Sequence, residues 1–197
     1  DFVGVWTSKM CCLAAALALA DAAGATPTPQ GALAAAILHG VENLADHVTH
    51  FALFFMPDFA RPAYQGRDWH AEAVNRFTAM QGSAARRLVE ARARLLHIAG
   101  ILGGKWPHTL AIQPGGVTKA PDARDRVRII ATLRSFRRAL EETIFAAPVE
   151  DFAALATLSD LEAWSSGDAG LFLRIARDLG LAGLGPGTMV SIWPLAW

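Results

Sequence analysis

The chain has 197 residues, of which 53% are hydrophobic, and its 18 acidic and 18 basic side chains give a net charge of zero. This length suits one domain, or part of one, with a substantial buried core. The balanced charge gives no indication of a nucleic-acid surface, and the tryptophans fit core or interface positions better than base-stacking platforms.

Hydrophobic periodicity predicts a chain that is almost entirely helical. The first helix is expected over Ser8–Ala23, with its first residue as N-cap and Gly24 at its end. After the stiff connector Thr26–Pro29, a long helix is expected over Gln30–Met56, ended by the proline that follows.

A second long pattern predicts one continuous helix over Asp68–Leu102, with its first residue as N-cap, and a third predicts a helix over Asp122–Ala146. The predicted fold is therefore all-α, a bundle of long helices with a Gly/Pro-rich loop and very little strand. The remaining expected elements are two shorter helices, a loop and two strands: Val149–Ser165, Asp168–Leu179, Gly180–Gly187, Thr109–Gln113 and Met189–Trp193.

The segment Gly103–Val117, GGKWPHTLAIQPGGV, lies between two of these helical patterns. A connection between helices needs only about 2–8 residues and no special chemistry. Here glycines are expected to adopt positive φ and prolines to fix their neighbours, so that Lys105 and His108 project from a stiff turn. The residues expected to shape the loop are Gly103, Gly104, Pro107, Pro114, Gly115 and Gly116. The alternative is a structural loop that braces a helical core, with both side chains satisfying buried carbonyls.

Two other groups of polar residues have a functional and a structural interpretation. His39, Asn43, His47 and His50 recur at helical spacing, which suits either a zinc site or a polar face with hydrogen-bonded histidines inside the bundle. We expect the structural role, because no HExxH pairing is present. The arginines that follow Gln81 and Pro121 suit solvated helix faces with ion pairs, or contact with an acidic partner surface.

No targeting or membrane-spanning segment is expected. The apolar run Met10–Ala20 ends at Asp21, whereas a membrane span needs roughly 20 residues. The first residue is Asp1, which suggests the edge of a fragment. The two cysteines, Cys11 and Cys12, are adjacent, and without a disulfide framework we expect a cytoplasmic protein.

The glycine-rich turn, Lys105, the Pro107–His108 pair and the Pro-Gly-Gly that follows resemble a signature of the large subunit of [NiFe] hydrogenases. The segments Leu44–Arg61 and Trp69–Thr118 resemble the cyanobacterial-uptake and H2-sensing branch of that family. The resemblance extends from about Cys12 to about Ile192, and implies an internal fragment of a longer subunit. It implies a parent reaction of reversible H2 oxidation, in uptake or sensing.

The resemblance also implies an iron–sulfur small subunit as partner, with Lys105 and His108 as candidates for the subunit interface or a proton relay. The family holds a Ni–Fe centre with cysteine thiolates from two CxxC pairs. At the position of the first pair this chain reads GVWT, near Gly4 and Thr7, and the second pair is absent. We therefore expect no metal site, no catalytic residue and no activity in the isolated chain.

Residues 1–197 are thus interpreted as a single partial domain that lacks both CxxC ends. A fragment with altered edges is the favoured explanation, and ends that are out of frame are another. A third possibility is a hydrogenase-like scaffold for assembly of the Ni–Fe cofactor, without catalysis of its own. A generic helical interaction protein is a further alternative, and a buried, rigid turn at Gly103–Gly116 would weaken it.

Overall fold

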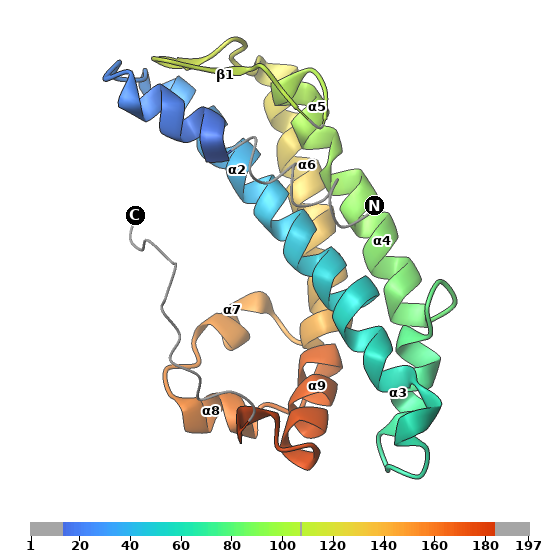
Figure 1. The fold of residues 1–197 in the computed structure, drawn as a ribbon. Helices are drawn as coiled ribbons and strands as arrows, with labels where there is room; N and C mark the ends of the chain where they lie inside the picture. The colour runs from blue at the N-terminus through green and yellow to red at the C-terminus, as the bar shows by residue number, and fades with distance from the viewer. Residues whose placement is uncertain (1–13, 107, 184–197) are drawn as a thin grey trace.

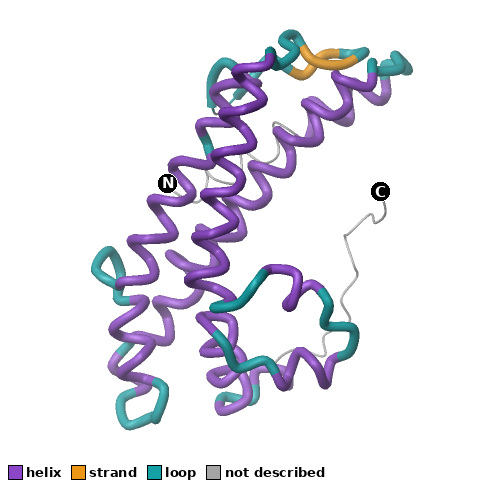
Figure 2. Tube along the Cα trace, turned by 180° about the vertical axis from the view of Figure 1, so that it is seen from behind, coloured by secondary structure: helices purple, strands orange, loops and turns teal. Residues whose placement is uncertain are grey.

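The structure, a computed structural model, describes residues 14–106 and 108–183. The helices α2 (Pro29–Thr49), α4 (Ser83–Leu95) and α6 (Ala123–Leu140) run side by side along the molecule (Figure 1). In the described part of the chain, the strands amount to one short hairpin (Figure 2), which confirms the all-α prediction.

The sequence of α2 explains where it begins and which face it buries. The Thr28 side chain accepts a hydrogen bond from the Gly31 amide at 3.1 Å, and Pro29 occupies the first turn, where a missing N–H does no harm. Its buried residues follow a three- and four-residue spacing, which directs one apolar face into the bundle: Gly31, Ala34, Leu38, Val41, Ala45 and Val48.

Both α2 and α6 widen into π-helical turns at their C-terminal ends, η1 (His50–Phe55) and η4 (Glu141–Phe145). A buried threonine accompanies each transition. Thr49 donates its hydroxyl proton to the Ala45 carbonyl at 2.6 Å, and Thr143 makes the same bond to the Ala139 carbonyl. A second donor on these carbonyls loosens the regular helical ladder and favours the wider spacing. The segment expected as Gln30–Met56 is thus helical, and the 3-10 turn η2 (Met56–Ala60) follows it.

The prediction of one continuous helix over Asp68–Leu102 is wrong. The segment forms α3 (His70–Phe77), α4 and α5 (His97–Gly103). Between α3 and α4 the chain turns back so closely that a Cβ on Gly82 would lie 2.2 Å from the Arg76 carbonyl oxygen. The Gly-Ser pair that opens α4 is the local signal for this break.

The expected N-cap of that segment, Asp68, does not cap α3. Trp69 occupies the cap position without a side-chain capping bond. Its indole is fully buried, and its Nε1 donates to Asp178 Oδ2 at 2.8 Å. Tertiary burial of the tryptophan therefore determines how the chain enters α3.

The expected helix Val149–Ser165 is also divided, into α7 (Val149–Ala153) and α8 (Leu158–Ala163). A reciprocal capping box starts the second helix: Asp160 N donates to Thr157 Oγ1 at 3.1 Å and Thr157 N donates to Asp160 Oδ2 at 3.0 Å. The last long element, α9 (Gly167–Asp178), confirms the expected helix Asp168–Leu179 to within one residue at each end.

The remaining expectations have mixed outcomes. Residues 14–22 are helical and Gly24 has φ +67°, as the first helix predicted, while the expected start at Ser8 lies outside the described residues. Of the expected strand Thr109–Gln113, only β1 (Ile112–Gln113) forms, and it pairs with the unexpected β2 (Gly116–Val117). Leu181–Gly183 forms a 3-10 turn where a loop was expected. The expected strand Met189–Trp193 lies outside the described residues.

Two apolar cores support the fold. One joins α2, α4, α5 and α6 through residues such as Leu38, Leu88, Leu95 and Phe136. The other lies at the opposite end from the hairpin and joins η2, α3 and α9 around Trp69. There, Phe59 packs edge-on against the Trp69 ring with centroids 6.3 Å apart.

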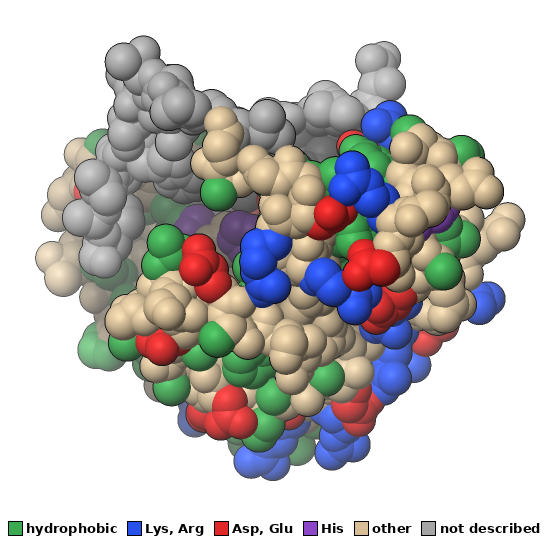
Figure 3. Space-filling view, turned by 90° about the horizontal axis from the view of Figure 1, so that it is seen from below, with side chains coloured by type: hydrophobic (Ala, Val, Ile, Leu, Met, Phe, Trp, Pro, Cys, Tyr) green, Lys and Arg blue, Asp and Glu red, His purple; other side chains and the backbone are tan. Residues whose placement is uncertain are grey.

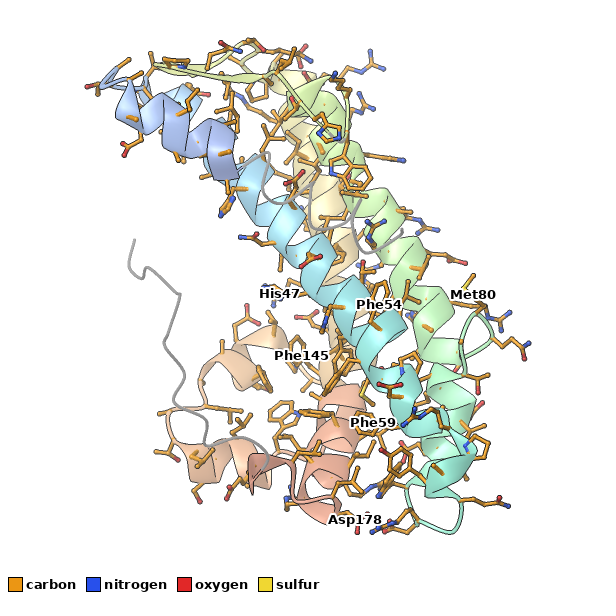
Figure 4. All side chains as sticks on the ribbon, in the orientation of Figure 1. His47, Phe54, Phe59, Met80, Phe145 and Asp178 are labelled. Carbon is orange, nitrogen blue, oxygen red and sulfur yellow. The ribbon has the colours of Figure 1, made fainter. Side chains whose placement is uncertain are left out.

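A row of ion pairs ties α3 and the turn before it to α9. Arg67 Nη1 contacts both carboxylate oxygens of Asp178, at 2.9 and 2.8 Å, and Arg174 pairs with Glu72. At the other end of the row, Arg76 Nη2 donates to Asp168 Oδ2 at 2.8 Å. Asp178 lies at the lower end of the molecule in Figure 4, and Figure 3 shows charged side chains of both signs mixed on that end. We call these pairs the α3–α9 ladder.

No helix in the described part of the chain is both long and apolar enough to cross a membrane.

Candidate functional site

The loop that the sequence singled out begins at the C-terminal end of α5. Gly104, with φ +70°, ends the helix and its amide donates to the Gly100 carbonyl at 3.1 Å. Gly103 differs from the expectation, because it is the last residue of α5 and has no positive φ. Its lack of a side chain makes room for Thr109, whose Oγ1 would lie 3.0 Å from a Cβ at this position.

The second half of the loop is the β1–β2 hairpin. Ile112 faces Val117 and Gln113 faces Gly116, so Pro114 and Gly115 form a two-residue turn. Proline followed by a glycine at φ +86° suits the central positions of a type II turn. Gly116, with φ +141°, approaches Gly31 of α2 so closely that a Cβ on Gly31 would lie 3.0 Å from the Gly116 Cα. The hairpin therefore lies directly on the first turn of α2. The sixth residue expected to shape the loop, Pro107, lies outside the described residues.

The middle of the loop is anchored by Trp106. Its Nε1 donates to Glu42 Oε1 of α2 at 3.0 Å, and the Arg92 guanidinium lies 5.5 Å from its ring centroid. Burial lowers the pKa of Arg92, while the charge of Asp46 acts in the opposite direction. One indole thus connects the loop to both α2 and α4.

Thr109 and Lys119 make two further connections. Thr109 Oγ1 donates to the Gly103 carbonyl at 2.8 Å and accepts from the Ala111 amide at 3.0 Å. Lys119 Nζ lies 2.9 Å from Asp125 Oδ2 and also donates to the Ile101 carbonyl at 3.3 Å. The loop is therefore fixed to the bundle at its start, its middle and its end.

The Lys119–Asp125 contact predicts a pH dependence of stability. The hydrogen bond from Lys119 is the main cause that lowers the pKa of Asp125 in the folded protein. A carboxyl with a lowered folded pKa stabilises the fold fully above its unfolded pKa, about 4, and loses that contribution as the pH falls through the folded value. We expect Asp125→Asn to flatten the fall in the free energy of unfolding below about pH 5.

Urea titrations at a series of pH values measure this effect. Asp151→Asn is the control, because Asp151 is likewise an aspartate near a helix start, but it is exposed and its side chain makes no hydrogen bond within the described residues, whereas Asp125 is buried. An unchanged acid slope in Asp125→Asn would contradict the assigned role.

Lys105 and His108 lie on the outer side of this anchored loop. Both are exposed, and neither makes a hydrogen bond or ion pair within residues 14–106 and 108–183. His108 has φ +60°, in the left-handed region that non-glycine residues seldom occupy. The Lys105 ammonium and the His108 imidazole are therefore accessible to a partner. Within the described residues they do not hydrogen-bond to buried carbonyls. Because the turn is anchored and exposed, the generic helical interaction protein remains an alternative.

The histidines of α2 and of the first position of η1 do not occupy the place expected for them. His39, His47 and His50 are exposed and Asn43 is half-buried, so this polar face is turned to solvent and does not lie inside the bundle. His47 is labelled in Figure 4. His50 instead lies against Phe55, with ring centroids 6.4 Å apart. The described part of the chain contains no group of three or more His, Cys, Asp or Glu residues that could hold a metal ion.

A groove of about 570 Å³ lies beside the hairpin, between residues 14–22, the start of α2 and the two strands. Its lining consists mainly of alanines and glycines, together with Leu17, Ile112 and a few polar side chains. Such a lining suits an apolar chain better than a charged cofactor. A second pocket, of about 330 Å³, lies between α3, η4 and α9, and its arginines and glutamates include members of the α3–α9 ladder.

Sequence reasoning missed the contacts that hold the loop in place. The sequence patterns above assign no role in the loop to Glu42 or to Lys119. The signal for Lys119 was weak: a lysine three residues before a helix cap at Asp122, with a carboxylate at Asp125. No local pattern could have linked Trp106 to Glu42, because the two residues are 64 positions apart.

Comparisons with known proteins identify no family for this chain. No protein-family model matches it, and no curated protein matches it.

Proposed function

We propose that the chain is an internal part of a [NiFe] hydrogenase large-subunit-like protein, which acts in H2 uptake or H2 sensing together with an iron–sulfur small subunit in the cytoplasm. The proposal is supported by the GGKWPHTLAIQPGGV signature and by its setting in an all-α bundle. One observation carries most of it: an anchored loop holds His108 exposed, in an uncommon backbone conformation.

Strained backbone persists only where the surroundings impose it, and it clusters at functional positions. The bonds from Trp106, Thr109 and Lys119 supply that constraint. In this proposal Lys105 presents a positive charge to the small subunit, and His108 orders hydrogen bonds or passes a proton at the contact. The rest of the loop positions these two side chains.

The residues of this chain do not fit a Ni–Fe centre, and we assign no step to one. Such a centre takes thiolate ligands, and the two cysteines are the adjacent Cys11 and Cys12, outside the described residues. The chain supplies a surface and a scaffold in this proposal, and the metal chemistry belongs to the complete parent subunit.

Substitutions at the loop test the proposal. We expect Lys105→Ala and His108→Ala each to weaken association with a co-expressed iron–sulfur small subunit roughly tenfold, since a charged or hydrogen-bonding contact is lost. The melting temperature should change by no more than about 2 °C, because neither side chain has a partner within the described residues. Affinity purification and calorimetry measure the two effects.

Thr109→Ala is the control within the same loop. It removes two hydrogen bonds that hold the backbone, so it should lower the melting temperature by about 4 °C. If His108→Ala destabilised the protein as much as Thr109→Ala and left association unchanged, the histidine would be structural and the proposal would fail.

A second candidate is a hydrogenase-like scaffold that assembles the Ni–Fe cofactor without catalysis. The segment GVWT, which stands where the resemblance implies the first CxxC pair, favours it. The sequence that flanks this segment in its gene distinguishes the two candidates. An upstream CxxC and a downstream DPCxxCxxH-like tail support the catalytic or sensing subunit, and their absence supports the scaffold.

A further inference from the structure

The exposed surface of α6 carries an unusual concentration of positive charge. Six of the chain's 18 basic residues lie on this helix and all are exposed: Arg124, Arg126, Arg128, Arg134, Arg137 and Arg138. The sequence contains no acidic residue between Asp125 and Glu141. In a chain with no net charge, a helix face of a single sign requires a specific explanation.

Intramolecular ion pairs account for only part of this charge. Arg137 pairs with Glu141 and Glu150, and Arg128 lies 3.9 Å from Asp125. Arg124 and Arg134 make no hydrogen bond or ion pair within the described residues. The expected ion pairs therefore account for Arg128 and Arg137, and they leave Arg124 and Arg134 without a partner within the described residues.

The same face also exposes apolar side chains between the arginines. Val127 is 68% exposed and Ile130 is 49% exposed. With Ala131 they follow helical spacing along one line toward Arg134. The opposite side of the helix holds the buried Ile129 and Phe136, which pack into the bundle. In Figure 1, α6 lies behind α2 and α4.

We propose that this face, defined by Arg124, Val127, Ile130, Ala131, Arg134 and Arg138, is a docking surface for an acidic amphipathic helix of a protein partner. The helix has 18 residues and is about 27 Å long, which matches one partner helix laid along it. Partner carboxylates pair with the arginines, and apolar residues of the partner cover Val127 and Ile130. This inference does not depend on the proposed hydrogenase function.

The apolar centre separates this partner from the two other anionic surfaces that attract arginines. A nucleic acid would place phosphates against Val127 and Ile130, and the face offers no aromatic side chain on which a base could stack. A membrane-surface helix needs a broad apolar face with aromatic anchors. Here the larger apolar face of α6 is already buried in the bundle.

The test uses the whole chain and a synthetic peptide of about 18 residues, the length of α6, with a stripe of leucines flanked by glutamates. We expect a dissociation constant on the order of 10–100 µM at about 50 mM salt, weakened roughly fivefold or more at about 300 mM. Fluorescence anisotropy with a labelled peptide measures both values. A scrambled peptide of the same composition, and one with glutamine for glutamate, should each bind at least roughly tenfold more weakly.

Matched variants locate the binding. Arg134→Glu should weaken the peptide roughly tenfold, whereas Arg61→Glu, an equal change of charge at another exposed arginine, should leave it unchanged. Val127→Ser tests the apolar half of the surface, and should weaken binding roughly threefold without unfolding an exposed site. Circular dichroism of each variant verifies the fold.

Several results would overturn the proposal. The first is an absence of peptide binding at low salt, and the second is equal binding of the scrambled peptide. The third is tighter binding of a short DNA duplex or of anionic phospholipid vesicles with the same dependence on Arg134. That result would assign the face to nucleic acid or to a membrane.

Discussion

Arg76→Gln is expected to lower the free energy of unfolding by about 3 kcal/mol. Asp168, at the start of α9, is completely buried, and its carboxylate accepts hydrogen bonds from the Arg76 guanidinium. Burial raises the pKa of Asp168, and Arg76 opposes that rise. Without the arginine, the folded protein must either bury an uncompensated charge or bind a proton. Urea denaturation at neutral pH measures the loss.

Arg174→Gln is the matched control, since Arg174 pairs with Glu72 in the same ladder but both side chains are about half exposed. It should lower stability by less than about 1 kcal/mol. The pH dependence provides a second check. In Arg76→Gln the folded pKa of Asp168 lies further above its unfolded value, so stability is greatest below the unfolded pKa and is lost as the pH rises through the folded one. The loss of unfolding free energy caused by Arg76→Gln should therefore become smaller toward acid pH. Equal losses for the two variants would contradict the special role of the buried pair.

Gly170→Ala is expected to destabilise the protein by about 3 kcal/mol or more. A Cβ on this residue of α9 would lie 2.1 Å from the backbone carbon of Ser165. Backbone cannot move aside as a flexible side chain does, so the α8–α9 connection must shift as a unit. Thermal and urea denaturation report the change.

Gly100→Ala gives the opposite expectation at another helical glycine. Gly100 is exposed in α5, and a Cβ there would meet nothing within 4 Å. Alanine should therefore stabilise the protein by about 0.5–1 kcal/mol through its helix propensity. If both variants were destabilised to the same extent, loss of glycine in general would explain the result and the close contact with Ser165 would not.

The sequence predicted helix where periodicity and caps agree. Asp122 caps α6, Thr28 precedes the start of α2, and Gly24 ends the first helix, all as local rules require. It failed where tertiary packing decides. The break at Gly82 depends on a turn against the Arg76 carbonyl, and the start of α3 depends on burial of Trp69. Periodicity records which residues are apolar, and it does not record where a helix must stop to bury them.

For the candidate loop, the sequence predicted the shape of the backbone better than the contacts that anchor it. Its glycine and proline content indicated a shaped backbone, and positive φ at Gly104, Gly115 and Gly116 agrees with that. Of the two carboxylates that anchor it, Glu42 could not be predicted, because it lies 64 positions from Trp106, and Asp125, six positions from Lys119, had only a weak local signal. The sequence also left open whether His108 is buried, and only its exposed position resolves that question.

The α3–α9 ladder has a consequence for the order in which the molecule can assemble. Its partners lie far apart along the chain, 111 positions for Arg67 and Asp178 and 92 for Arg76 and Asp168. Synthesis adds about 5–20 residues per second. The segment around Trp69 therefore leaves the ribosome several seconds before α9, which packs against it. The contacts of α4 with α2 and with α6 join residues that are closer in sequence, so they can form first. The aromatic end around Trp69 therefore stays uncovered by α9 for several seconds, and we expect chaperones to bind it during synthesis.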